Sequence, residues 1–250
     1  MSNDKTFSLN GKNIPFARNE TIMDAALKAG EYIDHLCHHP DYKPHGSCRV
    51  CMVKVDGKLV SACTQPAIAG TDVISNSDEI IKTRRNLLQM LFVEGNHVCP
   101  TCEKSGECQL QALAYRNKML SPHYSHFFPK RGVDASHPDI IIDFNRCILC
   151  ELCVRASRDV DKKNIFCISG RGISSQLIIN SSSGKLGDSD FSLTDMAAKV
   201  CPVGAIVPKH RGFEIPIGER RYDKQSINEI ETTNVEHDRV NKTKPTKGIT

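Results

Sequence analysis

Twelve cysteines stand in this chain of 250 residues, and eleven of them fall into three groups. The groups have the spacings C-x10-C-x2-C-x11-C, C-x2-C-x5-C and C-x2-C-x2-C, the last completed by a Cys-Pro pair far downstream. The first residues lack the apolar stretch of a signal peptide, so we expect a reducing, cytoplasmic compartment in which disulfides are rare. Clustered thiols in such a compartment favour metal or redox chemistry over structural pairing.

The first group consists of Cys37, Cys48, Cys51 and Cys63. Its pattern is typical of a [2Fe–2S] centre, which takes four thiolates. A two-residue hairpin turn at Asp56-Gly57 pairs Val55 with Lys58 and so brings Cys51 beside Cys63. The long loop that precedes the hairpin can then fold its own two thiols over the same point.

Two other kinds of site are considered for the first group. Structural zinc also accepts four thiolates, but usually through two short C-x2-C pairs, and Cys37 and Cys63 have no such near partner. A Rieske centre needs two histidine ligands. Four thiols already complete the site, although three histidines stand nearby in the sequence, namely His35, His38 and His39.

The second group consists of Cys99, Cys102 and Cys108. Three thiols within ten residues are too dense for core packing, in which cysteines come singly on an apolar face. One ligand is missing and His97 lies just upstream, so we predict His97 as the fourth ligand. Three more distant histidines are weaker candidates, namely His123, His126 and His137.

The third group consists of Cys147, Cys150, Cys153 and Cys201. Its C-x2-C-x2-C run is that of ferredoxins that hold a [4Fe–4S] cluster. In two-cluster ferredoxins a further cysteine serves the other cluster, but Ser157 occupies that position here. We therefore predict one four-iron cluster closed by Cys201, with Pro202 after it as usual. The remaining Cys167 alternates with Ile165 in a strand-like run and is predicted to be a buried small hydrophobe.

Short strands and helices must position these ligands, and the pattern predicts an α+β chain. Strands are expected at 5–9, 13–17, 50–55, 58–62 and 71–74, with a helix at 22–29 capped by Thr21 and another from Ser77 to about Phe92. Later come a strand leading to Cys147, strands near 165–169 and 174–179, and a helix at 193–200 capped by Ser192.

Five units follow from this pattern. They are residues 1–78, residues 79–118, a connector at 119–138, residues 139–222 and a polar tail at 223–250. The tail is nearly free of large apolar side chains, so we expect it to be disordered, or ordered only on a partner.

The composition and the glycine motifs argue against several classes of function. A formal charge of +4, dispersed along the chain, does not indicate a nucleic-acid partner, and the absence of a run of about 18 apolar residues argues against direct membrane insertion. Gly170, Gly172 and Gly184 lack the neighbours of a dinucleotide or phosphate-loop fingerprint. The chain is therefore expected to carry electrons without itself binding a nicotinamide, a flavin or hydrogen.

Three stretches resemble an electron-transfer region that several oxidoreductase complexes share. They run from Glu94 to Cys108, from Cys147 to Cys153 and from Cys201 to Ala205. This region is found in the large iron–sulfur subunit of respiratory NADH:quinone oxidoreductase, in iron-only hydrogenases and in the small diaphorase subunit of NAD-reducing nickel–iron hydrogenases. The chain length and the segment from Pro216 to Tyr222 are most similar to the diaphorase subunit.

The resemblance implies a fold, cofactors and partners. It implies a ubiquitin-like β-grasp [2Fe–2S] domain, a [4Fe–4S] segment held by one histidine and three cysteines, and a ferredoxin-like [4Fe–4S] domain. The implied partners are a flavin- and NAD-binding diaphorase subunit and the small and large subunits of a nickel–iron hydrogenase. Catalysis would belong to that NAD-reducing hydrogenase complex, with no substrate site on this chain. One departure is that only Val98 separates His97 from Cys99, where many members have three residues.

Two alternatives stay open at this point. The same relay could serve a formate dehydrogenase or a respiratory NADH dehydrogenase. From another class, the thiols could hold zinc in a structural or interaction protein, which would be colourless where an iron–sulfur protein is brown.

Overall fold

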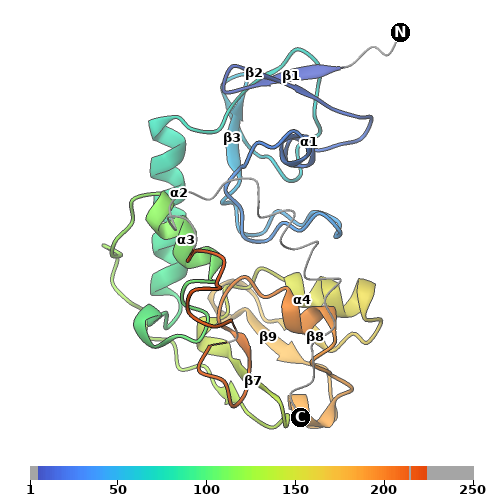
Figure 1. Ribbon diagram of the computed structural model, residues 1–250, viewed down its shortest axis with the longest axis vertical. Helices are drawn as coiled ribbons and strands as arrows, with labels where there is room; N and C mark the ends of the chain where they lie inside the picture. Colours follow the sequence, from blue (N-terminus) through green and yellow to red (C-terminus); the bar gives the residue numbers. More distant parts are fainter. Residues whose placement is uncertain (1–4, 214, 224–250) are drawn as a thin grey trace.

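The computed structural model describes residues 5–213 and 215–223, and its N-terminal part is a five-stranded sheet (Figure 1). The strands are β1 (Thr6–Leu9), β2 (Lys12–Pro15), β3 (Met52–Val55), β4 (Lys58–Ser61) and β5 (Asp72–Ile74), in the order β2-β1-β5-β3-β4. Helix α1 (Ile22–Lys28) packs Ile22 and Met23 into the core that Phe7 and Val53 supply from the sheet. The predicted strands are confirmed.

Helix α1 begins where the sequence predicts it. The Thr21 hydroxyl accepts a hydrogen bond from the Asp24 N–H, and the Asp24 carboxylate accepts one from the Thr21 N–H. This reciprocal pair is a capping box, which satisfies two of the amides that a helix start leaves without partners.

A long helix, α2 (Asp78–Val93), leads from the sheet to the second group of cysteines. It begins at Ser77, whose hydroxyl accepts a hydrogen bond from the Ile80 N–H, as predicted. Its buried Arg84 donates to the carbonyls of Val50 and Met52 and so connects the helix to the start of β3. A 3₁₀ turn (Cys99–Thr101) and helix α3 (Gln109–Arg116) follow.

The unit predicted at 139–222 is called the third unit here, after the sheet domain and the segment of the second cysteine group. From β7 onward it has the element order β-α-β-β-α-β of ferredoxin-like domains. Its elements are β7 (Ile140–Asp143), α4 (Leu152–Arg155), β8 (Phe166–Ser169), β9 (Gln176–Ile179), α5 (Met196–Lys199) and β10 (Ile206–Pro208). The outer strands β7 and β10 pair antiparallel, as do the inner strands β8 and β9. Short helical turns lie between them, at Phe144–Arg146, Ala156–Val160, Gly172–Ser174 and Leu186–Asp188.

The helix predicted at 193–200 is wrong in length and in its cap. Helix α5 covers only Met196–Lys199, and Ser192 lies outside its start. The Asp161 carboxylate accepts hydrogen bonds from the N–H groups of Met196 and Ala197 instead. Because this cap comes from a residue far upstream, the local pattern around Ser192 could not reveal it.

Two predicted boundaries also shift. The connector predicted at 119–138 ends in strand β6 (Val133–Asp134), which pairs with β7 and so belongs to the third unit. Conversely, the segment 216–222 packs against the second unit: Arg220 donates to the Ser105 carbonyl, and the Tyr222 N–H donates to the Gly106 carbonyl. The Arg220 guanidinium fills the space that a side chain on Gly106 would occupy.

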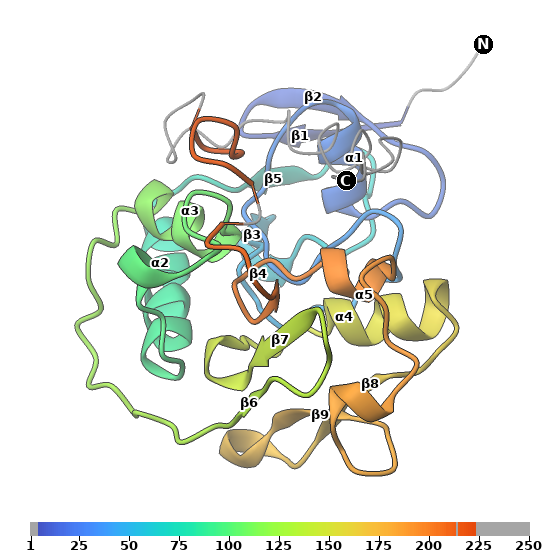
Figure 2. The same ribbon diagram turned by 60° about the horizontal axis from the view of Figure 1, so that its bottom comes forward.

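The three units form one body. Figure 1 shows the five-stranded sheet at one end and the third unit at the other, with α2 running along one side. Figure 2 shows the connector passing around the outside from α3 to β6. None of the described helices is both long and apolar enough to cross a membrane. The predicted tail lies outside the described residues from 224 onward.

Candidate functional site

The four thiols of the first group lie as two close pairs. The sulfurs of Cys51 and Cys63 are 3.4 Å apart, because Val55 pairs with Lys58 across the predicted turn. The thiol of Cys48 donates to the sulfur of Cys37, and this bond is the main reason why the pKa of Cys37 is lowered. Two thiolates on one tetrahedral metal ion, with bonds of about 2.3 Å, lie about 3.8 Å apart. Two pairs therefore fit a two-iron centre with two thiolates on each iron.

A single metal ion fits these thiols less well. Among residues 5–213 and 215–223, no three histidine, cysteine or carboxylate side chains converge closely enough to hold one ion. Of the nearby histidines, His35 has a ring nitrogen 2.7 Å from the Ile33 carbonyl. His38 lies 3.5 Å from the Asp24 carboxylate, and its buried ring nitrogens have no hydrogen-bond partner among the described residues. The geometry favours a cluster over either zinc or a Rieske centre.

The loop of the first group turns its backbone amides towards its own sulfurs. Amides of Ser47 and Cys48 donate to the Cys37 sulfur, and the Val50 amide donates to Cys48. Left-handed backbone at Gly46 and Arg49, with φ of 73° and 57°, bends the loop into this shape. Amide hydrogen bonds stabilise thiolates and the clusters they hold.

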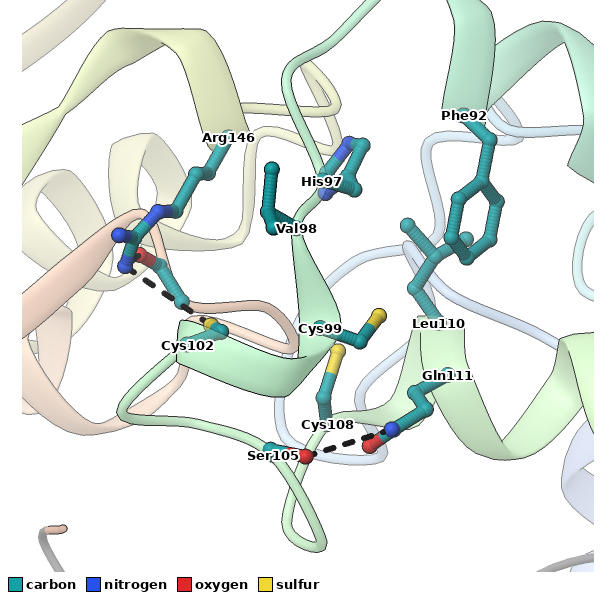
Figure 3. A pocket seen from close by; sticks show the side chains of 11 residues that line it. Phe92, His97, Val98, Cys99, Cys102, Ser105, Cys108, Leu110, Gln111 and Arg146 are labelled. Carbon is teal, nitrogen blue, oxygen red and sulfur yellow. Dashed lines mark hydrogen bonds between the residues drawn. The ribbon is translucent and has the colours of Figure 1, made fainter.

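The second group lines one hollow together with His97 (Figure 3). Its three thiols come from the 3₁₀ turn and from the residue before α3, and Phe92 and Leu110 close the apolar side. Burial raises the pKa of Cys108 to about 12 and also raises that of Cys99. Thiols in such surroundings stay protonated unless a cation holds them as thiolates.

The imidazole of His97 has the properties of a metal ligand. Its Nε2 atom is buried and has no hydrogen-bond partner among the described residues. Burial, and then the charge of Arg146, lower the pKa of His97 to about 4, so the ring is neutral at ordinary pH. Neutral imidazole is the form that binds metal. The donor set fits a four-iron cluster because a histidine with a buried, unpartnered ring nitrogen lines the same hollow as three thiols, among the described residues.

The other three candidate histidines are not brought to this hollow. His123 and His126 are exposed on the connector. His137 is buried, but Nε2 lies 3.1 Å from the Phe191 carbonyl and Nδ1 accepts from the Asp139 N–H. Among the four histidines considered, His97 is the one that lines the hollow.

Two glycines allow the backbone to approach the second group closely. A methyl group on Gly95 would lie 2.6 Å from Nε2 of His97 and 2.8 Å from the Asn145 carbonyl. A methyl group on Gly204 would lie 2.7 Å from the Cys102 sulfur. The two positions need glycine because any side chain would collide with a predicted ligand. The sequence analysis did not single out either residue, although both lie in the stretches that carry the resemblance.

Arg146 joins the second group to the third. One guanidinium nitrogen lies 3.8 Å from the Cys102 sulfur and 3.3 Å from the Gly204 carbonyl, and another lies 2.9 Å from the Asp143 carboxylate. Arg146 directly precedes Cys147, so this cation sits between two predicted cluster ligands. Apart from its position next to Cys147, the sequence gave no indication that Arg146 would contact the second group.

The third group lines a second apolar hollow, which contains Cys147, Cys150, Cys153 and Cys201. The amides of Leu149 and Leu152 donate to the sulfurs of Cys147 and Cys150, and left-handed backbone at Leu149 and Glu151 makes this possible. Burial raises the pKa of Cys147 to about 11 and those of Cys150 and Cys153 further. This donor set also fits a four-iron cluster.

Two further sequence predictions can be checked in the third unit. Ser157, at the position of the extra ferredoxin cysteine, is fully buried, and its hydroxyl accepts from the Ile165 N–H at 2.8 Å. Cys167 is only partly buried, so the prediction of a fully buried residue is wrong. The reason is that β8 pairs with β9 alone in a two-stranded sheet, which leaves one face partly open.

The first and third groups share one buried cluster of side chains. Cys37 and Tyr42 belong to the same buried cluster of side chains as Cys150 and Cys153. The side chain of Cys48 packs against a further cluster that contains Cys108 and contacts Cys147 and Cys201. The three donor sets are therefore linked through two shared clusters of packed side chains, and the third set takes part in both.

Three family models match the chain in the order of these sets. A 2Fe-2S iron-sulfur cluster binding domain matches residues 3–78, an NADH-ubiquinone oxidoreductase-G iron-sulfur binding region matches residues 84–123, and a 4Fe-4S single cluster domain matches residues 140–207. The fold and the donor sets thus define an iron–sulfur protein that carries both two-iron and four-iron domains. The alternative of a zinc-stabilised protein is not supported.

A relative that is similar over nearly the whole chain defines the family more narrowly than the three domain models do. The chain is 39% identical over 221 residues to the NAD-reducing hydrogenase HoxS subunit gamma of Cupriavidus necator, which covers 88% of this chain and 94% of the relative. It belongs to this family of hydrogenase gamma subunits, as the resemblance predicts.

A solved structure agrees with this assignment, and a longer subunit of another oxidoreductase is also similar. A chain in the crystal structure of an NAD+-reducing [NiFe]-hydrogenase in the H2-reduced state aligns with a TM-score of 0.87 and 50% identity, over 92% of this chain and 98% of that chain. NADPH-Fe(3+) oxidoreductase subunit alpha of Geobacter sulfurreducens is 32% identical over 82% of this chain, which spans 24% of that relative.

Proposed function

We propose that this chain relays electrons between a flavin- and NAD-binding subunit and a nickel–iron hydrogenase module, through one [2Fe–2S] and two [4Fe–4S] clusters. The proposed ligands are Cys37, Cys48, Cys51 and Cys63 for the first cluster, His97, Cys99, Cys102 and Cys108 for the second, and Cys147, Cys150, Cys153 and Cys201 for the third. The observation that carries the proposal is that two shared clusters of packed side chains link the three donor sets.

The residues of the chain have three tasks in such a relay. Bound clusters would supply one-electron storage, which no side chain of this protein offers. The apolar side chains around each donor set keep water away, and the loop amides donate to the ligand sulfurs. Neutral His97 places one uncharged ligand in the second set, which makes that cluster about one charge less negative than a set of four thiolates.

Several finer features belong to the proposal. The strand order β2-β1-β5-β3-β4 with α1 packed on the sheet supports a ubiquitin-like β-grasp for the first domain. None of the twelve cysteines, all within the described residues, forms a disulfide, which supports a reducing, cytoplasmic compartment. The identity and coverage of the hydrogenase relatives favour a hydrogenase host over a formate dehydrogenase or a respiratory dehydrogenase.

Metal analysis of the full chain, purified without oxygen, tests the cofactor part of the proposal. The expected result is about ten iron and about ten sulfide per chain, the sum of one two-iron and two four-iron centres. Cys150→Ser is expected to lose the third centre, whereas Cys167→Ser, the matched control outside the three sets, is expected to keep all three. Bound zinc without sulfide would refute the proposal.

The relay part has its own test. The purified single chain is expected to show no NADH-dependent dye reduction. When it is added to the flavin subunit and the hydrogenase subunits, electrons are expected to pass between those subunits. Robust NADH oxidation by the single chain would contradict the assignment of catalysis to the partners.

A further inference from the structure

Arg155 occupies an unusual place between the first and third groups. It lies at the end of α4, two residues after Cys153, and is only 4% exposed. One of its terminal nitrogens donates to the Cys37 carbonyl at 2.5 Å and to the Cys150 carbonyl at 3.3 Å. The other donates to the Lys43 carbonyl at 3.1 Å, and Nε donates to the Glu151 carbonyl at 3.3 Å.

Every acceptor of this guanidinium is a neutral carbonyl. Among residues 5–213 and 215–223, no carboxylate lies within ion-pair distance of Arg155. The nearest aromatic partner, the ring of Tyr42, is 5.9 Å from the guanidinium carbon and supplies only a weak attraction. The Asp159 carboxylate acts on Arg155 only from beyond ion-pair distance. A buried cation without a close counter-charge is destabilising, so a nearer anion is expected to offset the charge of Arg155.

The proposed clusters supply that anion. Four thiolates around a cluster core of formal charge about +2 leave a net charge of about −2 in the oxidised state. Arg155 hydrogen-bonds to the backbone of one ligand of each of two such clusters, Cys37 of the first and Cys150 of the third. The cation therefore contacts one proposed ligand residue of each cluster and could offset the negative charge that each bound cluster would carry.

We infer that Arg155 is the shared counter-ion of the first and third clusters and a positioning residue that holds their ligand loops together; this inference rests on the proposed function. When a cluster takes up one electron, a ferric site is reduced to ferrous and the cluster becomes one unit more negative, without a proton. A fixed buried cation stabilises the reduced form more than the oxidised form. Arg155 thus raises the reduction potentials of both clusters.

The test is a redox titration, followed by electron paramagnetic resonance, on the full chain with all clusters loaded. Arg155→Gln keeps a hydrogen-bond donor and removes the charge, so the first and third centres are expected to shift to lower potential. The second centre, which Arg155 does not contact, serves as the internal reference and is expected not to shift. Arg155→Lys keeps the charge and is expected to retain both potentials.

A matched control uses the neighbouring Arg158, which is exposed and paired with Asp159. Arg158→Gln is expected to leave all three potentials unchanged. Unchanged first and third potentials in loaded Arg155→Gln would overturn the inference, and so would an equal shift of all three centres. If the glutamine variant fails to load its clusters, lowered potentials in Arg155→Lys would overturn it instead. Absence of iron and sulfide from the wild-type chain would refute the proposed function, which is a separate outcome.

Discussion

Gly204→Ala probes the second donor set without replacing any proposed ligand. The added methyl carbon would lie 2.7 Å from the Cys102 sulfur, whereas ordinary contact begins at 3.4 Å, so the sulfur must move by at least 0.7 Å, the difference between these distances. In the metal-free chain the thiol can rotate away at little cost. In the loaded chain the bond to iron holds Cys102 in place, so the same methyl group becomes an overpacking defect.

The expected cost in the loaded chain is that of overpacking, about 1–3 kcal/mol. Because 1.4 kcal/mol corresponds to a factor of ten, Cys102 should bind iron about 5- to 150-fold more weakly. We expect partial conversion of the second centre to a three-iron form, with the first and third centres intact. Electron paramagnetic resonance and iron analysis measure this loss, and thermal unfolding of the metal-free chain measures the baseline.

Gly132→Ala is the matched control, because a methyl group at Gly132 meets nothing within 4 Å and its backbone is not left-handed. It is expected to leave all three centres unchanged. The reasoning is refuted if Gly204→Ala keeps a full second centre, because Cys102 would then not be held by iron. It is also refuted if the metal-free variant is destabilised as much as the loaded one.

Three further predictions concern the same donor sets. His97→Ala should make the second centre labile or convert it to a three-iron form, while exposed His123→Ala should not; an intact spectrum and potential in His97→Ala would move the assignment to another residue. Cys201→Ser should remove the third centre and increase hydrogen exchange across residues 139–213, because bound metal contributes much of the stability of small metal-binding domains; unchanged exchange after iron chelation would contradict this. Burial lowers the pKa of His97 to about 4, so its ring stays neutral between pH 6 and 8 and loses that state only as pH falls towards 4. The potential of the second centre should therefore not depend on pH from 6 to 8, and a slope of about 59 mV per pH unit would show a coupled proton.

Local sequence patterns were enough to predict most of the proposed cluster ligands. The turn at Asp56-Gly57 is a short-range signal, and it places Cys51 beside Cys63 through pairing that the residues themselves specify. The caps at Thr21 and Ser77 are equally local, because each side chain satisfies an amide three residues ahead. The C-x2-C runs can be recognised for the same reason, since a loop of a few residues keeps its thiols near one another.

Tertiary structure decided what lies between the donor sets. The contacts of Arg155 with Cys37, of Gly204 with Cys102 and of Asp161 with the start of α5 join residues that are far apart in the chain. No periodicity or spacing encodes such contacts, because they depend on how whole units pack after each has formed. The burial of Nε2 of His97, which has no hydrogen-bond partner among the described residues, also depends on packing: Gly95 lies between the ring and the distant Asn145 carbonyl, where a side chain would collide with both.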